Sequence, residues 1–279
     1  MTAPYQTIHV NIQGGIARVT IDNAPVNVLS LQMMTELTGF LDTVKDDTAV
    51  KVVIFDSANP EFFIAHVDMT MAEDAKIFEK LGAITLPGLN PFQSLSERLR
   101  RLPQVTIVKL EGMARGGGAE FVAAADMSFG AIGKAALSQV EALMGIVPGG
   151  AGTQYLRHRV GRNRAMEIVL GVDLFDAKTA ERYGWINRAV PADEIDAFVD
   201  TLAQNIANLA DGVIAAAKLS LPAEDYSAGL EIENTAWAGL FAQPAAGRLL
   251  VGGLENGAQT PVVERNIEAM LRELAAQRP

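Results

Sequence analysis

A chain of 279 residues, 49% of them hydrophobic, is long enough to bury a large core in one domain, or in a domain with a smaller appendage. Its formal net charge of −10 argues against nucleic acid as a partner, because non-specific nucleic-acid binding needs a basic surface. The absence of cysteine excludes disulfides, a thiol nucleophile and a thiolate metal site.

The histidines and the apolar runs limit the remaining classes of site. His9, His66 and His158 do not stand at helix-face spacing, so we expect no multi-histidine metal site and no bound metal. No run approaches the roughly 18 apolar residues that a membrane helix needs. The start Met1–Tyr5 has neither the basic stretch nor the apolar core of a secretory signal. We therefore expect a cytoplasmic protein without a membrane partner.

The chain opens with a predicted β-hairpin and a helix. Ile8–Gln13 and Ile16–Ile21 alternate between apolar and polar residues, and Gly14-Gly15 between them is typical of a hairpin turn. Val28–Val44 then shows helical periodicity, with Ser30 as a candidate N-cap.

Three continuous apolar runs are typical of buried parallel strands: Val50–Phe55, Val105–Leu110 and Met127–Ile132. Helical stretches near Met71–Leu81 and Phe92–Leu102 separate the first run from the second. Strands that alternate with crossover segments predict right-handed βαβ units and an α/β fold.

The second half of the chain is predicted to be almost wholly helical from about Gly149 onward. The break between an α/β body and a helical tail lies near residues 190–205. We place it after residue 200, which gives a body of residues 1–200 and a helical region of residues 201–279. The expected helices cover residues 153–159, 162–170, 177–183, 192–209, 213–219, 224–241 and 261–276.

Three consecutive glycines, Gly116, Gly117 and Gly118, stand between the strand Val105–Leu110 and a helix. Each glycine disfavours a helix by roughly 1 kcal/mol relative to alanine, so the three need a reason. One reason is close approach of a ligand to bare N–H groups at the positive end of the helix, which stabilises negative charge on an oxygen. The alternative is tight packing of the helix against the strand.

Two glutamates interrupt apolar stretches. Glu120 lies one helical turn past Gly117 and can face the same ligand, or it can pair with a cation such as Arg115. Glu141 follows the strand Met127–Ile132, and its alternative is the common one of a solvated surface glutamate.

The segment Glu61–Met69 is an unusually apolar loop after the strand Val50–Phe55. It therefore lies at the carboxyl edge of a parallel sheet, where α/β proteins bind ligands, and it can line a pocket. In the alternative interpretation, Phe62 and Phe63 are core residues and Asp68 caps the next helix.

In this order and spacing, the three segments resemble the crotonase (enoyl-CoA hydratase/isomerase) superfamily. Phe63–Asp68 matches a Phe-x-Ala-Gly-Ala-Asp loop, Gly116–Glu120 matches a Gly-Gly-Gly-x-Glu helix start, and Val140-Glu141 precedes the turn Gly145–Gly149. The resemblance covers roughly residues 5–220. It implies a crotonase-like spiral of ββα turns with a C-terminal helical trimerisation region, and hence a homotrimer or homohexamer.

The resemblance also implies a chemistry. The thioester oxygen of an acyl-CoA would be held by the N–H groups of Val67 and Gly117, and Glu120 and Glu141 fall on the two acid/base positions. Because both glutamates are present, the resemblance favours hydration of a 2-trans-enoyl-CoA to a 3-hydroxyacyl-CoA. One carboxyl activates the water and the other protonates the α-carbon, so we expect no cofactor beyond the coenzyme A of the substrate. The further substrate contacts that it implies are Val28, Ala65, His66, Asp68, Met69, Gly116, Pro148 and Gly149.

Two residues depart from the family pattern: His66 replaces a glycine and Val67 replaces an alanine. His66 either tolerates a positive φ or donates a hydrogen bond to the ligand, and the branched Val67 side chain can narrow the acyl entrance.

The departures leave open another acyl-CoA reaction on the same fold, such as double-bond isomerisation, hydrolysis or decarboxylation. A dinucleotide-binding enzyme is disfavoured because the glycines do not fit Gly-x-Gly-x-x-Gly. The two glutamates argue against a non-catalytic interaction protein.

Overall fold

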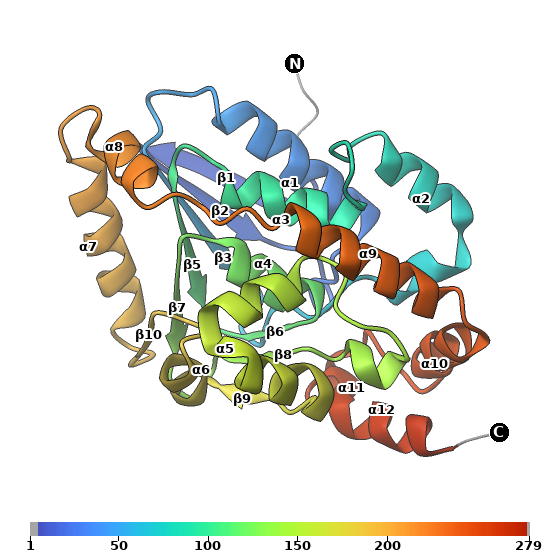
Figure 1. The fold of residues 1–279 in the computed structure, drawn as a ribbon. Helices are drawn as coiled ribbons and strands as arrows, with labels where there is room; N and C mark the ends of the chain where they lie inside the picture. The colour runs from blue at the N-terminus through green and yellow to red at the C-terminus, as the bar shows by residue number, and fades with distance from the viewer. Residues whose placement is uncertain (1–4, 278–279) are drawn as a thin grey trace.

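The computed structural model describes residues 5–277. Most of the N-terminal segment Met1–Tyr5, in which no secretory signal was predicted, therefore lies outside the described residues. Two β-sheets form the centre of the molecule (Figure 1). In the larger sheet the first two strands are antiparallel and the others run parallel. Its strand order is β1 (Ile8–Gln13), β2 (Ile16–Ile21), β3 (Val52–Ser57), β5 (Val105–Leu110), β7 (Met127–Ala131) and β10 (Arg188–Val190).

The smaller sheet contains short strands in the order β4 (Phe62–Ile64), β6 (Met113–Arg115), β8 (Ala136–Ser138) and β9 (Phe175–Asp176). The pairs β3–β4, β5–β6 and β7–β8 each place one strand in either sheet before the chain enters helical structure. This repetition is a spiral of ββα turns. The helical segments that follow the strand pairs are α1 (Leu31–Val44), η1 (Met69–Glu73), α2 (Ala75–Gly82), α3 (Pro91–Arg100), α4 (Gly117–Ala124), η2 (Glu141–Met144) and α5 (Gly152–Gly171).

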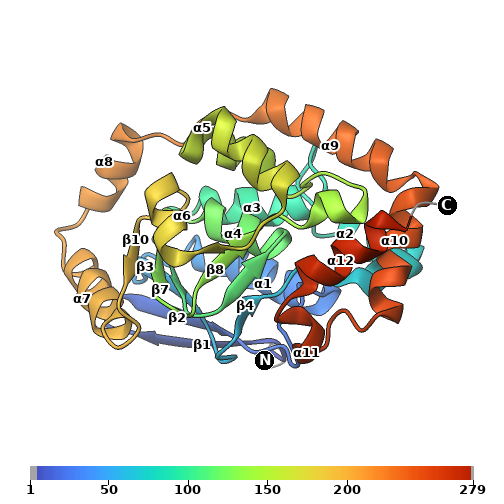
Figure 2. The ribbon, with the colours of Figure 1, turned by 90° about the horizontal axis from the view of Figure 1, so that it is seen from below.

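The C-terminal part of the chain is mainly helical. In both views α9 and α10 lie at the end of the molecule opposite α7 (Figures 1 and 2). No helix within residues 5–277 has the length and apolar character needed to cross a bilayer. The helices are α6 (Ala177–Tyr183), α7 (Ile195–Ala207), α8 (Val213–Ser220), α9 (Ser227–Phe241), α10 (Pro244–Glu255), α11 (Pro261–Glu264) and α12 (Ile267–Ala276).

The predicted hairpin turn and the predicted helix cap near the start of the chain are both confirmed. Gly14 and Gly15 form the β1–β2 turn with positive φ values of 59° and 78°, which glycine adopts without steric cost. The Ser30 side chain accepts a hydrogen bond from the Met33 N–H and so caps α1.

Both faces of the large sheet are covered, which explains why its central strands are largely apolar. In β3, Val53 and Phe55 belong to the main core, and Phe55 packs edge-on against Phe121 of α4 at a centroid distance of 5.1 Å. Val52 and Ile54 belong to a second cluster with α7 on the opposite face. Successive side chains of a strand point to opposite faces, so a strand covered on both sides shows a nearly continuous apolar run in place of an alternation.

Several predicted elements need correction. The chain after Gly149 is mainly helical, as predicted, but the short strands β9 and β10 each add a strand to a sheet. Helix α10 was not expected, and α5 joins two predicted helices across a kink at Gly161. The division after residue 200 falls inside α7, which packs on the large sheet, and the two-part organisation stays a prediction.

Candidate active site

The three motif segments meet because each follows a strand of the small sheet. Strands β4, β6 and β8 are parallel neighbours, so their carboxyl ends lie side by side. Residues 65–69 follow β4, Gly116 and Gly117 follow β6, and Glu141 follows β8. The stretch Glu61–Met69 was expected to be a loop, but it begins with the short strand β4.

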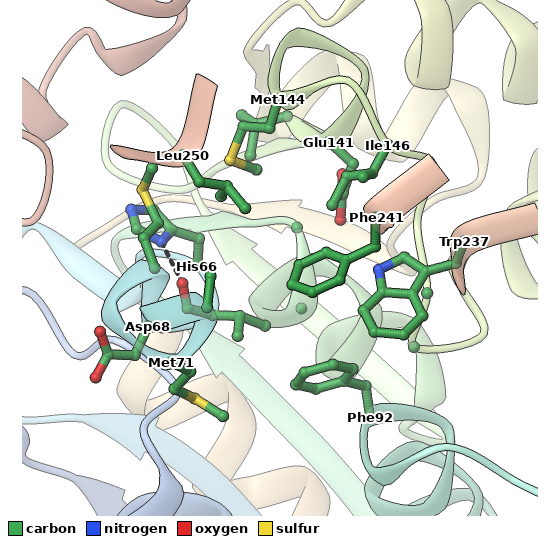
Figure 3. Close-up of a pocket in the computed structure, with 18 of the residues that line it drawn as sticks. His66, Asp68, Met71, Phe92, Glu141, Met144, Ile146, Trp237, Phe241 and Leu250 are labelled. Atoms are coloured by element: carbon green, nitrogen blue, oxygen red, sulfur yellow. Dashed lines mark hydrogen bonds between the residues drawn. The ribbon is translucent and has the colours of Figure 1, made fainter. Parts of the chain in front are cut away.

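A cavity of about 80 Å³ lies where these segments face the C-terminal helices (Figure 3). Val67, Gly117, Glu120 and Glu141 all line it. The wall is otherwise largely apolar, and it includes side chains from the helical segment between β4 and β5 and from α9 and α10. These apolar and aromatic residues are Met71, Phe78, Phe92, Met144, Ile146, Trp237, Phe241 and Leu250.

The three glycines have different roles. Gly116 has a positive φ of 49°, and a Cβ there would lie 3.0 Å from Oε1 of Glu141. A Cβ on Gly117 would lie 2.7 Å from the Val67 side chain and 3.9 Å from Oε2 of Glu120. The packing explanation therefore holds for Gly118, whereas Gly116 and Gly117 leave room for the Glu141 and Val67 side chains at the cavity, and the approach of a ligand to their N–H groups stays a prediction.

Gly118 allows α4 to pack directly on β4. A Cβ at this position would lie 2.3 Å from the backbone oxygen of Ile64, which cannot move without distorting the strand. We expect Gly118→Ala to destabilise the protein by about 1–3 kcal/mol in denaturant unfolding, as overpacking does. Gly39→Ala is the control, because Gly39 lies within α1, a Cβ there would meet no atom within 4 Å, and alanine is favoured in a helix by roughly 0.5–1 kcal/mol. Equal stability of the two variants would contradict the packing role.

Glu120 is buried in the first turn of α4. Its Oε1 accepts hydrogen bonds from the N–H groups of Gly150 at 2.8 Å and Gly152 at 2.9 Å. Burial raises the pKa of Glu120 well above its usual range, and the nearby carboxyl groups of Glu141 and Glu233 raise it further. The two N–H groups act in the opposite direction because they favour the ionised form.

Glu141 is only 6% exposed, so the surface interpretation of this residue is wrong. Burial raises its pKa to about 8, with a further contribution from Glu233, while the charge of His66 and a backbone hydrogen bond lower it. One terminal atom of the Gln139 amide lies 2.9 and 3.0 Å from the two carboxyl oxygens. This amide can accept from a protonated Glu141 through its oxygen or donate to the ionised form through its nitrogen.

Arg115 does not pair with Glu120, so that alternative is also wrong. Its fully buried guanidinium donates to both oxygens of Glu268, from Nε at 2.6 Å and from Nη2 at 3.2 Å. Its Nη1 faces Glu264 at 3.9 Å, and Glu264 binds the ring of His66 at 2.8 Å. We call these four residues, His66, Arg115, Glu264 and Glu268, the charged tetrad.

The Val67 N–H points away from the strand-like pairing that holds its segment. Leu29 donates to the His66 carbonyl at 2.8 Å and accepts from the Asp68 N–H at 3.2 Å. In this parallel bridge the N–H and C=O of Val67 face the other side. Neither the Val67 N–H nor the Gly117 N–H has a protein acceptor within residues 5–277. Both are therefore free to bind a ligand oxygen.

The other predicted contact residues divide into two groups. His66, Asp68, Met69, Gly116 and Gly149 line the cavity. Asp68 also caps η1 through Thr70, and Phe62 and Phe63 are buried, as the core interpretation proposed. The structure does not bring the remaining three to the cavity, and their contacts with substrate stay predictions: Val28, Ala65 and Pro148.

Sequence reasoning missed the contribution of α9. Glu233, Trp237 and Phe241 stand four residues apart and share one face of this helix, and a polar residue followed by two aromatic rings at this spacing was the available signal. The Trp237 and Phe241 rings stack with centroids 5.0 Å apart, and Phe92 contacts Trp237 at 5.8 Å. Figure 3 shows these three rings opposite His66 across the cavity. Gln139, beside Glu141, was missed as well.

Several known proteins are similar to this chain in sequence and structure. The family model "Enoyl-CoA hydratase/isomerase" matches residues 11–246. The crystal structure of "a putative enoyl-CoA hydratase" from Streptomyces avermitilis is 58% identical, covers 98% of this chain and 100% of its own, and superposes with a TM-score of 0.96. The "probable enoyl-CoA hydratase echA8" of Mycobacterium bovis is 29% identical over 68% of this chain and 71% of its own length.

Mouse mitochondrial methylglutaconyl-CoA hydratase is 30% identical over 169 residues, or 60% of this chain. The match spans about half of the mammalian relatives, 52% of the mouse and 48% of the human protein. The spiral of ββα turns with its C-terminal helical region is the crotonase fold, as predicted. From its motifs, its fold and these matches, the chain belongs to the enoyl-CoA hydratase/isomerase family of the crotonase superfamily.

Proposed function

We propose that this protein hydrates 2-trans-enoyl-CoA thioesters to 3-hydroxyacyl-CoA. One observation carries the proposal: two buried carboxyl groups, Glu120 and Glu141, line the same small cavity as the unpartnered N–H groups of Val67 and Gly117. Addition of water to a conjugated thioester needs a base, an acid and donors for a negatively charged oxygen, and these four residues supply them. Relatives named as enoyl-CoA hydratases support the same reaction class.

In this proposal the thioester oxygen accepts hydrogen bonds from Val67 and Gly117. The charge on that oxygen grows as the double-bond electrons move toward it, so donors fixed in advance favour the enolate over the substrate. The Gly117 N–H also lies at the N-terminus of α4, where the helix dipole adds to the attraction.

We assign Glu120 as the base and Glu141 as the acid. Burial raises the pKa of both carboxyl groups, that of Glu141 to about 8, so the pair holds a proton at neutral pH; the N–H groups of Gly150 and Gly152 favour the ionised form of Glu120 and thereby favour placing that proton on Glu141. The two groups are coupled, so the titration belongs to the pair, and the amide donors favour loss of the proton from Glu120.

The proposed hydration involves one proton transfer to Glu120 and one from Glu141. Glu120 takes a proton from water while the water oxygen bonds to the β-carbon, and the double-bond electrons move onto the thioester oxygen. Glu141 then gives its proton to the α-carbon as the carbonyl reforms. The proton on Glu120 returns to Glu141 before the next cycle.

The cavity wall favours an apolar acyl group. The side chains that line it beyond the carboxyl groups include Phe92, Trp237 and Phe241. A polar or charged acyl group would lose its hydration there without a partner. We therefore infer an unsaturated acyl chain without polar groups.

The experiment follows the ultraviolet band of the conjugated thioester, which hydration removes. Purified protein should consume crotonyl-CoA, and mass spectrometry should detect a product heavier by one water. An unchanged band with crotonyl-CoA and with longer enoyl-CoAs would refute the hydratase assignment. A panel of other acyl-CoA thioesters would then show whether the same site catalyses isomerisation, hydrolysis or decarboxylation.

The pH dependence tests the assignment of Glu141 as the acid. Its raised pKa of about 8 means that the folded protein holds a proton there, so kcat should fall as the pH rises through about 8 and the acid is lost. An increase in kcat through that range would contradict the assignment of Glu141 as the acid.

The raised pKa of Glu141 also makes stability depend on pH. The folded state binds more protons than the unfolded chain between about pH 4.5 and 8, so the free energy of unfolding should decrease with pH across this window. The Glu141→Gln variant should lack this part of the pH dependence in denaturant unfolding.

A further inference from the structure

The residue next to the proposed oxyanion donor is a buried histidine. We propose that His66 is a positioning residue for the oxyanion site: held as an imidazolium by Glu264, it fixes the Val67 peptide and places a positive charge beside the cavity. This role rests on the proposed function, because it assigns His66 to the N–H group that would bind the thioester oxygen.

Both ring nitrogens of His66 face acceptors. Nδ1 lies 2.7 Å from the backbone oxygen of Val67, and Nε2 lies 2.8 Å from Oε1 of Glu264. A carbonyl oxygen can only accept, so Nδ1 carries a hydrogen. A neutral imidazole has a single N–H, and the second contact then needs either a protonated ring or a protonated carboxyl group.

The surrounding charges favour the ionised pair. The Arg115 guanidinium faces Glu264 at 3.9 Å, and the N–H of Gln259 donates to the same carboxylate at 2.8 Å. The pKa of Glu264 is lowered chiefly by the His66 ring, and Gln259 and Arg115 add to this effect, even though burial alone would raise it. A negative Glu264 at this distance requires a proton on His66.

The charges around His66 are balanced. Arg115 on β6 is paired with Glu268 on α12, and His66 is paired with Glu264 on α11, so the tetrad contains two cations and two carboxylates. Glu141 of η2 also lines the cavity, and its titratable carboxyl group interacts electrostatically with His66. Burial lowers the pKa of His66 and Arg115 lowers it further, but Glu264 and the Val67 carbonyl outweigh both, so the pKa is raised above 6.5.

The C-terminal segment holds the oxyanion loop at two points. Glu264 binds the His66 ring, and the Gln259 side chain accepts from the Met69 N–H at 2.7 Å. The His66 ring also binds the Val67 carbonyl, so the Val67 peptide is held by His66 before it in the chain and by the Met69 contact after it. Its N–H is then held in place before a ligand binds, which is the condition for strong stabilisation of a developing charge.

The positive charge has an effect that extends to the cavity. His66 lowers the pKa of Glu141, so its field already stabilises negative charge at that wall. An enolate oxygen at the Val67 N–H would experience the same attraction, which is strong where water is excluded. The glycine that the family pattern places at this position cannot supply such a charge.

The protonation state can be measured directly in the wild-type protein. The chain has three histidines, and the side chains of His9 and His158 are more than half exposed. The imidazole NMR signals that persist when the exposed His9 and His158 are each replaced by Gln are those of His66. We expect these signals to show a doubly protonated ring with a titration midpoint above 6.5. A neutral ring with one N–H at pH 6.5 would overturn the proposal, and this measurement on wild type does not depend on how well a variant folds.

A pair of ligands separates positioning from a structural role. Butyryl-CoA has a thioester carbonyl, and S-butyl-CoA has the same alkyl chain and sulfur without it. We expect His66→Gln to weaken butyryl-CoA binding about tenfold, comparable to one hydrogen bond to a charged group, and to leave S-butyl-CoA within about twofold. On crotonyl-CoA, kcat should fall by about 10–100-fold with a smaller change in KM. His158→Gln on α5 is the control and should match wild type.

Equal weakening of both ligands would show that His66 only supports the fold and would overturn the proposal. Glu264→Gln should reproduce the selective loss, because it removes the carboxylate that keeps the ring charged. The double variant His66→Gln/Glu264→Gln should then be no worse than either single one. If wild type hydrates no enoyl-CoA, the proposed function fails, but the ligand comparison still decides whether His66 serves a carbonyl-binding site.

Discussion

Glu120→Gln is expected to lower kcat for enoyl-CoA hydration by about 10²–10⁴-fold, with little change in KM. The amide keeps an oxygen that can accept from Gly150 and Gly152, so the loop and α5 should stay in place. It cannot take a proton from water, so the base is lost. Glu141→Gln should cause a loss of similar size because the α-carbon is left without its acid. Steady-state kinetics on crotonyl-CoA measure both.

Glu36→Gln provides a matched control for this loss. Glu36 is a buried glutamate that also accepts two backbone N–H groups, from Gln6 at 2.7 Å and Thr7 at 2.8 Å, but it lies on α1 and does not line the cavity. Its variant should keep kcat within about twofold, even if some stability is lost. Full activity in Glu120→Gln would remove this residue from the mechanism.

Arg115→Leu is expected to have the largest effect on stability. The substitution removes the cation between Glu268 and Glu264, and leaves Glu268 buried without its ion-pair partner. Breaking a buried ion pair by removing one partner typically costs about 3–5 kcal/mol, because the remaining charge has lost both water and its counter-ion. This loss corresponds to a decrease in Tm of roughly 10 °C for a chain of this size.

The control for Arg115 is a surface ion pair in the same region. Arg265 pairs with Glu61 at 3.1 Å, but both side chains are well exposed. Arg265→Leu should change the free energy of unfolding by no more than about 1 kcal/mol, as exposed pairs do. If Arg115→Leu and Arg265→Leu unfold at the same denaturant concentration, the tetrad does not stabilise the fold.

The long elements of this fold are visible in the sequence and the short ones are not. The hairpin strands, the three buried strands and helix α1 show their sequence patterns over five or more residues. Strands β4, β6 and β8 have three residues each, too few for an alternation to be recognised. These short strands bring the three motifs together, so the geometry of the site could not be derived from local patterns alone.

The sequence predicted only part of the candidate site, because local patterns reveal some of its residues and contacts between distant residues determine the others. Glycines before Glu120 and an apolar context around Glu141 are local features, and they identified the two carboxyl groups. The pairing of His66 with Glu264 joins residues 198 positions apart, and no periodic pattern predicts such a contact. The aromatic wall from α9 was missed because this helix lies beyond residue 220, where the recognised resemblance ends.

The most direct test of the proposed mechanism is a crystal structure with a bound acyl-CoA thioester. The thioester oxygen should lie about 2.7–3.1 Å from both the Val67 and Gly117 nitrogens, with the α- and β-carbons facing Glu141 and Glu120. The acyl chain should lie against Trp237 and Phe241. A thioester oxygen that contacts neither N–H group, or an acyl chain bound outside this cavity, would contradict the account.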